Sequence, residues 1–198
     1  MKFNIVIPAR WESQRLPGKP LLDLCGKSIL HRVYLQAQQT GAEHIIIATD
    51  DERISDAAKK FGARVCMTGS QHRSGTDRIC EVAHKLSWDA QQIVVNVQGD
   101  EPLIEPELIN QVALALTHTA ANVASLYSPV DPEHALDSHT VKLVHDKHGL
   151  ALYFSRSSIP FMRHPSEHLL RQHIGIYAYR VSFLRQFLTW ESAEIEQA

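Results

Sequence analysis

Residues 3–20 read FNIVIPARWESQRLPGKP, and this stretch decides the fold. It opens with a short apolar run, Phe3 to Ile7, that ends at a proline, which is typical of a strand buried on both faces of a parallel sheet. A polar loop that contains glycine and proline follows and continues to Lys27. Ser28 then favours the start of a helix, because its side chain can accept a hydrogen bond from a free backbone N–H group of the first turn. The stretch therefore predicts a strand, a long loop and a helix in that order.

The same order of elements recurs as far as Thr117. Short apolar runs predict further strands at residues 45–48, 64–67 and 93–97. Amphipathic segments predict helices that begin near Asp51, Thr76 and Pro106, where the proline suits a first helical turn. Alternation of this kind predicts a mainly parallel sheet with right-handed crossovers and helices on both faces. The fold class is therefore a Rossmann-like α/β sheet.

The pattern changes after Asn122 to strand-like pieces without intervening helices. These pieces are residues 123–127, 141–145, 151–154 and 174–179, and a last helix is predicted at residues 181–188. The change predicts a small antiparallel elaboration that binds an acceptor. We expect a single domain over residues 1–198, with a nucleotide-binding sheet in residues 1–120 and the elaboration in residues 121–180.

Composition limits the classes of function. The chain is 44% hydrophobic and 21% charged, which is typical of a soluble globular protein. A net charge of -2 leaves no basic surface for nucleic acid, and no apolar run reaches the roughly 20 residues that a membrane span needs. Cys25, Cys66 and Cys80 are far apart and odd in number, which favours reduced thiols. We expect a cytoplasmic protein that binds neither nucleic acid nor membrane.

The loop after the first strand carries three cations, Arg10, Arg15 and Lys19, together with Gly18. Ligands of open α/β sheets bind beyond the carboxyl ends of the strands, where this loop lies. A nucleoside triphosphate supplies about four negative charges that arginine and lysine bind well. The alternative is a solvated surface loop. The spacing matches neither a Walker A motif nor GxGxxG.

The loop after the fourth predicted strand reads QGDEP (residues 98–102) and should face the same crevice. Its Asp100 is the natural ligand for Mg²⁺, because magnesium bound to phosphates usually takes only one or two protein carboxylates. Glu101 is the less favoured candidate. The alternative is that Asp100 only forms a turn, since Gly-Asp is a common turn pair.

Several motifs together resemble one enzyme family. The segment IPARWESQRLPGKPL (residues 7–21) is similar to the nucleotide-binding signature of CTP:3-deoxy-manno-octulosonate cytidylyltransferases, also called CMP-Kdo synthetases. Further matching motifs follow in order: ATD at 48–50, SGTDR at 74–78, VNVQGDEP at 95–102, ALYFSR at 151–156 and HIGIY at 173–177. The resemblance implies a nucleotide-diphospho-sugar transferase type of fold. It also implies transfer of CMP from CTP to Kdo for lipopolysaccharide synthesis, with Mg²⁺ as cofactor, in a homodimer.

The resemblance also implies which residues form the site. Those implied to bind CTP are Arg10, Arg15, Lys19, Ser74, Thr76, Arg78 and Gln98. Those implied to bind Kdo are Gln98, Arg156, His173 and Tyr177. Lys19 and Asp100 are implied to be catalytic, with Asp100 as the metal ligand. Taken without the family, Arg156 fits a surface arginine equally well, and His173 on an apolar strand is more typical of a core histidine.

One departure from the family concerns the end of the chain. Members continue past the segment that corresponds to Phe183–Glu196 with a second metal-binding aspartate and much of the dimer interface, whereas this sequence ends at Ala198. We therefore expect the C-terminal part of the family domain to be absent. The departure favours, as an alternative, a form that binds nucleotide or sugar with impaired turnover. A related acceptor, 8-amino-Kdo or a sialic acid, is a further alternative.

Overall fold

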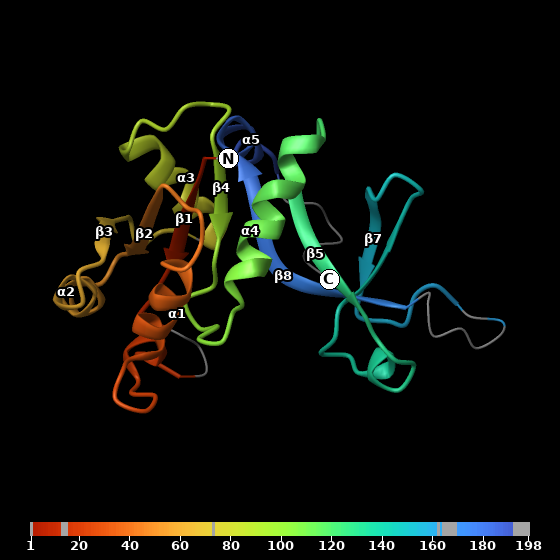
Figure 1. The fold of residues 1–198 in the computed structure, drawn as a ribbon, viewed down its shortest axis with the longest axis horizontal. Helices are drawn as coiled ribbons and strands as arrows, with labels where there is room; N and C mark the ends of the chain where they lie inside the picture. The colour runs from red at the N-terminus through yellow and green to blue at the C-terminus, as the bar shows by residue number, and fades with distance from the viewer. Residues whose placement is uncertain (1, 13–15, 73, 162, 164–169, 192–198) are drawn as a thin grey trace. The chain divides into compact units, whose positions relative to one another are not determined.

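The computed structural model describes residues 2–12, 16–72, 74–161, 163 and 170–191 (Figure 1). The chain divides into two compact units, one formed by residues 1–124 with 176–198 and one formed by residues 125–175. Within the described residues, no helix is both long and apolar enough to cross a membrane.

The first unit is built on a parallel sheet. Its strands are β1 (Phe3–Pro8), β2 (His44–Thr49), β3 (Arg64–Met67) and β4 (Ile93–Asn96). Strand β1 lies between β2 and β4, and β3 lies beyond β2, with parallel pairing throughout. The predicted parallel sheet is confirmed, and each predicted strand agrees with the observed one to within a residue at either end.

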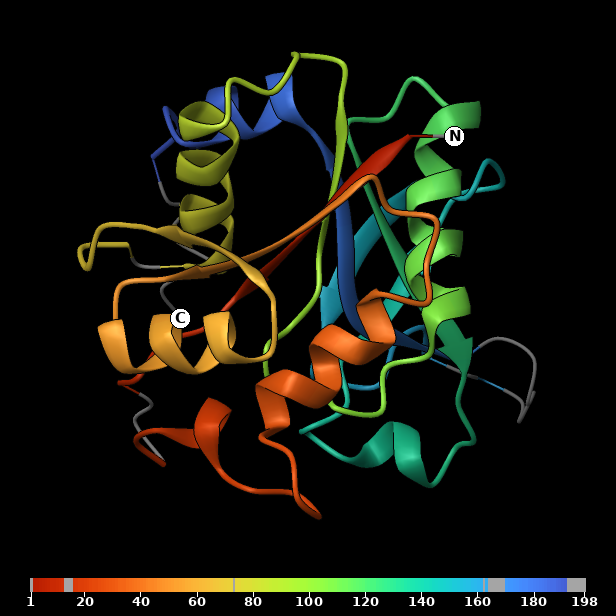
Figure 2. The same cartoon turned by 60° about the vertical axis from the view of Figure 1, so that its left-hand side comes forward.

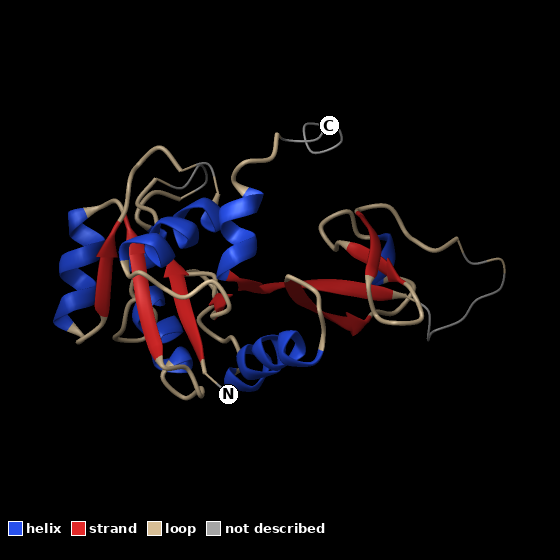
Figure 3. Ribbon diagram, turned by 90° about the horizontal axis from the view of Figure 1, so that it is seen from above, coloured by secondary structure: helices blue, strands red, loops and turns tan. Residues whose placement is uncertain are grey.

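Helices cover both faces of this sheet, as predicted (Figures 2 and 3). They are α1 (Ile29–Ala37), α2 (Glu52–Lys60), α3 (Gly75–Lys85), α4 (Pro106–Ala115) and α5 (Val181–Phe187), with short 3₁₀ turns η1 (Lys19–Leu21) and η2 (Leu116–His118). Ser28 caps α1 by accepting a hydrogen bond from the N–H of His31 at 3.2 Å, and Pro106 occupies the first turn of α4. These are the roles that the sequence predicts for both residues.

Strand β1 has no polar face because both of its faces are buried in the core. Val6 and Val94 pack in one cluster with the apolar side chains of α3 and α5, such as Ile79. Ile5 and Ile7 alternate with Val6 along the strand and are also fully buried. Because both faces of β1 are covered, a ligand can approach this strand only at its ends.

Strand β8 (Arg171–Arg180) belongs to both units. Its last residues pair antiparallel with β4 in the first unit, from Ile93 opposite Arg180 to Asn96 opposite Tyr177. The sequence predicts only residues 174–179, because Arg171 and Gln172 interrupt the apolar pattern. Residues 176–180 therefore extend the sheet of the first unit, whereas the predicted boundary assigns them to the elaboration.

The second unit contains β5 (Val123–Pro129) from Ser125 onward, η3 (His134–Leu136), β6 (Lys142–His145), β7 (Ala151–Ser155) and the start of β8. Strand β6 pairs antiparallel with β7 and with β8, which confirms the predicted antiparallel pieces. Lys142 is fully buried, and its ammonium donates to the carbonyl oxygens of Asp137, Thr140 and Arg156. The predicted role of this unit in binding an acceptor stays a prediction. The assignment of both units to a single domain also stays a prediction.

Candidate active site

A cleft lies where β1 and β4 end. Val6 and Asn96 are aligned in the paired strands, so the loops that follow begin side by side at one edge of the sheet. The cleft has a volume of about 220 Å³. It is lined by Pro8, Ala9, Arg10, Glu12, Lys19, Pro20, Gln98, Gly99 and Asp100. The predicted convergence of the two loops is confirmed.

Lys19 and Asp100 meet in this cleft. Nζ of Lys19 lies 2.5 Å from Oδ2 of Asp100, and each side chain keeps more than a third of its surface exposed. An exposed ion pair usually contributes less than about 1 kcal/mol to stability, so both groups can exchange this contact for a charged ligand at little cost. Arg15, the third predicted cation, lies outside the described residues.

The turn before Lys19 is fixed by Trp11, for which the sequence pattern predicts no role. Gly18 has a φ of 72°, in the left-handed region that favours glycine, and its N–H donates to the carbonyl oxygen of Trp11 at 2.9 Å. A Cβ at Gly18 would lie 3.0 Å from the Trp11 ring. Arg53 of α2 stacks on the same ring, with its guanidinium carbon 3.5 Å from the centroid. These contacts hold the long loop against the start of α2.

Gly99 allows the second loop to approach the first. A Cβ at Gly99 would come within 2.7 Å of the carbonyl oxygen of Pro8, a distance that real Cβ atoms essentially never show. Any larger residue would therefore push the loop that carries Asp100 away from the loop that carries Lys19.

Arg10 binds the backbone of a third loop, between β3 and α3. Its Nη2 donates to the carbonyl oxygens of His72 at 2.5 Å and of Ser74 at 3.2 Å. Ser74 is the N-cap of α3, where its hydroxyl accepts from the N–H of Asp77 and the Asp77 carboxylate accepts from the N–H of Ser74. Arg10 thus lines the cleft and also ties the start of α3 to it.

Arg78 lies inside the fold rather than in the cleft. Its side chain has no exposed surface, its Nη1 donates to the hydroxyl of Thr68, and its Nη2 lies 3.2 Å from Oδ2 of Asp50. The resemblance implies that Arg78 binds CTP, but the structure places its charge where it joins the ends of β2 and β3 to α3. In this position it supports the loops around the cleft, and its predicted contact with CTP stays a prediction.

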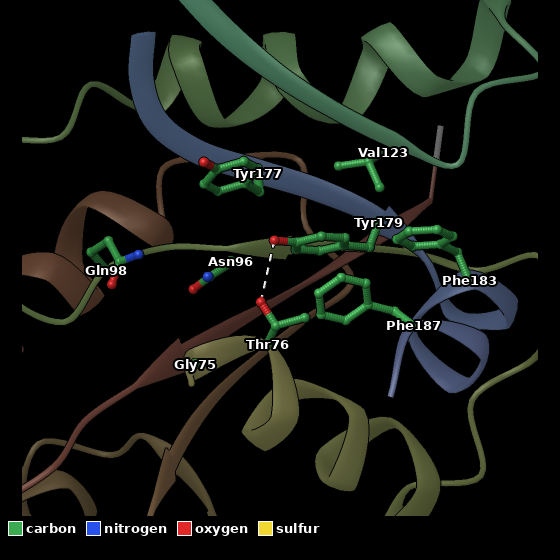
Figure 4. Close-up of a pocket in the computed structure, with 9 residues that line it drawn as sticks. All are labelled: Gly75, Thr76, Asn96, Gln98, Val123, Tyr177, Tyr179, Phe183 and Phe187. Carbon is green, nitrogen blue, oxygen red and sulfur yellow. Dashed lines mark hydrogen bonds between the residues drawn. The ribbon is translucent and has the colours of Figure 1, made fainter. Parts of the chain in front are cut away.

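A larger pocket of about 410 Å³ adjoins the same β4 loop. It is lined by Gly75, Thr76, Asn96, Gln98, Val123, Tyr177, Tyr179, Phe183 and Phe187, all in the first unit. Gln98 lines both this pocket and the charged cleft. Figure 4 shows the two tyrosines of β8 and the amides of Asn96 and Gln98 around one space. The predicted ligands Thr76, Gln98 and Tyr177 are therefore brought together.

The tyrosines of this pocket remain neutral phenols. The rings of Tyr177 and Tyr179 stack with centroids 5.9 Å apart, and the Tyr179 hydroxyl lies 3.4 Å from that of Thr76. Burial raises the pKa of Tyr179 to about 12, and burial also raises the pKa of Tyr177. Both hydroxyls can therefore donate hydrogen bonds at neutral pH.

Arg156 and His173 lie in the second unit. Arg156 has an exposed side chain whose Nη1 donates to the carbonyl oxygen of Ser138 at 2.8 Å. His173 is partly buried, its Nε2 lies 2.8 Å from the hydroxyl of Ser125, and its ring meets the edge of Phe154. Burial lowers the pKa of its imidazole, which favours the neutral form. These contacts of Arg156 and His173 are all with residues of the second unit.

Asp100 fits a metal ion that is bound mainly by phosphates. Among the described residues, no group of three or more His, Cys, Asp and Glu side chains gathers as an all-protein metal site. Mg²⁺ needs only one or two carboxylates when phosphate oxygens and water complete its shell. Burial, and then the neighbouring Asp100 carboxylate, raise the pKa of Glu101, which makes Glu101 less readily ionised than an ordinary glutamate. Asp100 is therefore compatible with a magnesium ion bound mainly by phosphate oxygens, and its role as the metal ligand stays a prediction.

Comparisons with known proteins agree on one family. A family model described as cytidylyltransferase matches residues 4–198. The 3-deoxy-manno-octulosonate cytidylyltransferase of Tolumonas auensis is 49% identical over 205 aligned residues, which cover 100% of this chain and 81% of the relative. That of Vibrio vulnificus is 48% identical and is covered to 82%. The chain thus spans about four fifths of the length of these relatives.

Solved structures give the same result for the fold. A CMP:2-keto-3-deoxy-manno-octonic acid synthetase complexed with CTP superposes with a TM-score of 0.93 at 42% identity, covering 100% of this chain and 81% of that one. A 4-diphosphocytidyl-2C-methyl-D-erythritol synthase superposes with a TM-score of 0.65 at 14% identity, a likeness of fold alone. The predicted Rossmann-like fold is therefore confirmed.

Proposed function

The chain belongs to the cytidylyltransferase family, and from this premise we propose that it transfers CMP from CTP to 3-deoxy-D-manno-octulosonate (Kdo). The products are CMP-Kdo and pyrophosphate. The observation that supports the proposal most is that a charged cleft and a larger, mainly apolar pocket meet at Gln98. CTP held in the cleft and Kdo held in the pocket would lie next to each other at Gln98. The α-phosphorus of CTP and the attacking hydroxyl of Kdo must meet at such a point.

The charged cleft suits the triphosphate. Lys19 and Arg10 lie on one of its loops and Asp100 on the other. Lys19 can release Asp100 and bind phosphate oxygens, with the charge of Arg15 from the same loop as a further proposed contact. Arg10 already uses one nitrogen for the carbonyl groups of His72 and Ser74, so we propose that its remaining N–H groups meet the nucleotide.

The larger pocket suits the sugar. Kdo carries several hydroxyl groups, and the phenols of Tyr177 and Tyr179 with the amide of Gln98 offer donors and acceptors for them. Its carboxylate needs a cation, for which Arg156 is the proposed partner, because a guanidinium binds a carboxylate through two parallel hydrogen bonds. His173 is proposed to contact the sugar as a neutral imidazole.

The reaction needs positioning more than a protein nucleophile. The oxygen of the anomeric 2-hydroxyl attacks the α-phosphorus, its P–O bond forms as the bond to the β-phosphate breaks, and the hydroxyl proton leaves to solvent. Lys19 neutralises charge that develops on the phosphates, and Gln98 can orient the sugar at the boundary. Mg²⁺ held by Asp100 would polarise the phosphate oxygens. Alignment and charge stabilisation are the contributions of this chain.

Pyrophosphate release tests the proposal. The protein is mixed with CTP, Kdo and Mg²⁺, and pyrophosphate is followed, with a known CMP-Kdo synthetase as the positive control. We expect release that depends on both substrates. CTP binding without turnover would instead support the alternative of a binding form, and faster turnover with 8-amino-Kdo or a sialic acid would reassign the acceptor. Size-exclusion chromatography tests the homodimer that the resemblance implies.

Gly99→Ala is expected to impair this reaction. The added methyl group must move away from the Pro8 carbonyl oxygen, which shifts Asp100 relative to Lys19. We expect kcat to fall about tenfold or more, because small misplacements of reacting groups are costly. The control is Gly41→Ala, whose new methyl group would meet only ordinary contacts of 3.7 Å or more. Initial rates of pyrophosphate release by the two purified variants test this prediction, and equal rates would contradict it.

A further inference from the structure

We infer that Glu81 of α3 is a positioning residue for CTP binding, which acts through His72 on Arg10. The inference rests on the proposed function, because it assumes that the cleft beside Arg10 binds the nucleotide. Glu81 lies outside the cleft and none of the motifs in the sequence pointed to it. Its role follows from a continuous series of contacts that begins at its carboxylate.

The carboxylate of Glu81 holds the loop between β3 and α3. Its Oε2 accepts from the N–H of Gly69 at 2.9 Å and also contacts Nε2 of His72. Its Oε1 lies 2.7 Å from Nζ of Lys85, which in turn donates to the carbonyl oxygen of Met67. One side chain therefore binds this loop near its start and near its middle.

The environment keeps this carboxylate ionised. Burial alone would raise the pKa of Glu81, but the hydrogen bonds from His72, Lys85 and the N–H of Gly69 outweigh it and lower the pKa to about 2. The side chains of Glu81 and His72 are only 21% and 14% exposed. Water therefore competes little for these contacts, so the anchor persists at neutral pH.

The other side of His72 leads to the cleft. The carbonyl oxygen of His72 accepts from Nη2 of Arg10 at 2.5 Å, and that of Ser74 accepts from the same nitrogen. Residues 69–72 belong to no helix or strand, so side-chain contacts must fix the position of this carbonyl group. Without Glu81, the His72 ring loses its partner, the loop gains freedom, and Arg10 loses a fixed acceptor.

CTP binding in the absence of Kdo tests the inference directly. Calorimetry on Glu81→Ala should show a Kd for CTP about tenfold higher than that of the unaltered chain, since a charge-assisted network is lost. Glu81→Gln, which retains an oxygen for the Gly69 N–H, should fall between the two. Glu43→Ala is the matched control, because Glu43 also pairs with a lysine, Lys2, but at the opposite end of β1. It should bind CTP normally.

Steady-state kinetics separate positioning from general damage to the fold. We expect Glu81→Ala to raise the KM for CTP while kcat and the KM for Kdo change less than about threefold. A variant that is merely less stable would lose active enzyme, and hence kcat, with KM unchanged. Circular dichroism checks folding, and if Glu81→Ala does not fold, Glu81→Gln and Lys85→Met carry the test.

A double-mutant cycle shows whether Glu81 acts through Arg10. In an Arg10→Ala background, Glu81→Ala should change the affinity for CTP by less than about twofold, because residues in one network are not additive. Full additivity of the two losses, or unchanged affinity in folded Glu81→Ala and Glu81→Gln, would overturn the inference. Absence of CTP binding by the unaltered chain would instead overturn the proposed function.

Discussion

Asp100→Asn is expected to lower kcat by roughly a thousandfold or more while the fold stays intact. The substitution keeps the shape of the side chain and removes the charge that would hold a metal ion. Asp100 stands in the loop after β4 with 47% of its side chain exposed, and it pairs with Lys19, whose side chain is 37% exposed. Its loss should therefore change the free energy of unfolding by no more than about 0.5 kcal/mol.

Glu101→Gln is the matched control for this prediction. Glu101 is the adjacent carboxyl group, and its raised pKa makes it less readily ionised than an ordinary glutamate. We expect a rate within a few-fold of the unaltered chain, whereas Asp100→Asn should not recover when the Mg²⁺ concentration is raised. Measuring pyrophosphate release over a range of Mg²⁺ concentrations checks both variants. A near-normal rate for Asp100→Asn would remove the metal assignment, and a larger loss for Glu101→Gln would transfer it.

Local sequence patterns predict most of the strands and helices of the fold. The strand at Arg64–Met67 has the predicted bounds, and the parallel pairing of β1 with β2 and β4 follows from alternation of strands and helices. Ser28 and Pro106 mark helix starts because capping and first-turn chemistry depend on neighbouring residues only. Such features are readable because the residues that determine them are close together in the chain.

The candidate site was predictable in position but not in its internal contacts. The loops that carry Lys19 and Asp100 converge because adjacent parallel strands end at the same edge. By contrast, the sequence gives no sign that Arg10 binds the His72 carbonyl group or that Glu81 holds His72. These contacts join residues from different elements, and only the packed structure fixes which of them meet.

Arg78 shows the same limit most clearly. The family resemblance implies that Arg78 binds CTP, whereas in the structure its side chain has no exposed surface. Its partners, Asp50 and Thr68, follow β2 and β3 and come next to α3 only when the sheet has formed. Because the charge of Arg78 is buried, we expect substitutions in this cluster to lower the stability of the fold.

Asp50→Ala should therefore be among the most destabilising single substitutions in the first unit. It would remove the carboxylate that pairs with the guanidinium of Arg78, which has no exposed surface, and leave the hydrogen bond to the Thr68 hydroxyl. Removing one member of a buried ion pair typically costs about 3–5 kcal/mol, because the other charge stays buried without compensation. Urea unfolding should show this loss as a lower midpoint at an unchanged slope.

Substitution of the other member of the pair, Arg78, should lower the free energy of unfolding less. This difference separates the cost of an uncompensated buried charge from a simple loss of contacts. Arg78→Met removes the buried charge itself and keeps much of the side-chain volume, while Asp50, at 20% exposure, can still be hydrated. Asp56→Ala removes a 3.9 Å pair with Lys59 on the surface of α2 and should change stability by less than about 0.5 kcal/mol. If Arg78→Met proved more damaging than Asp50→Ala, the dominant contribution would be packing around the arginine stem. The predicted order, with Asp50→Ala the worst and Asp56→Ala nearly neutral, arises only if the uncompensated charge sets the cost.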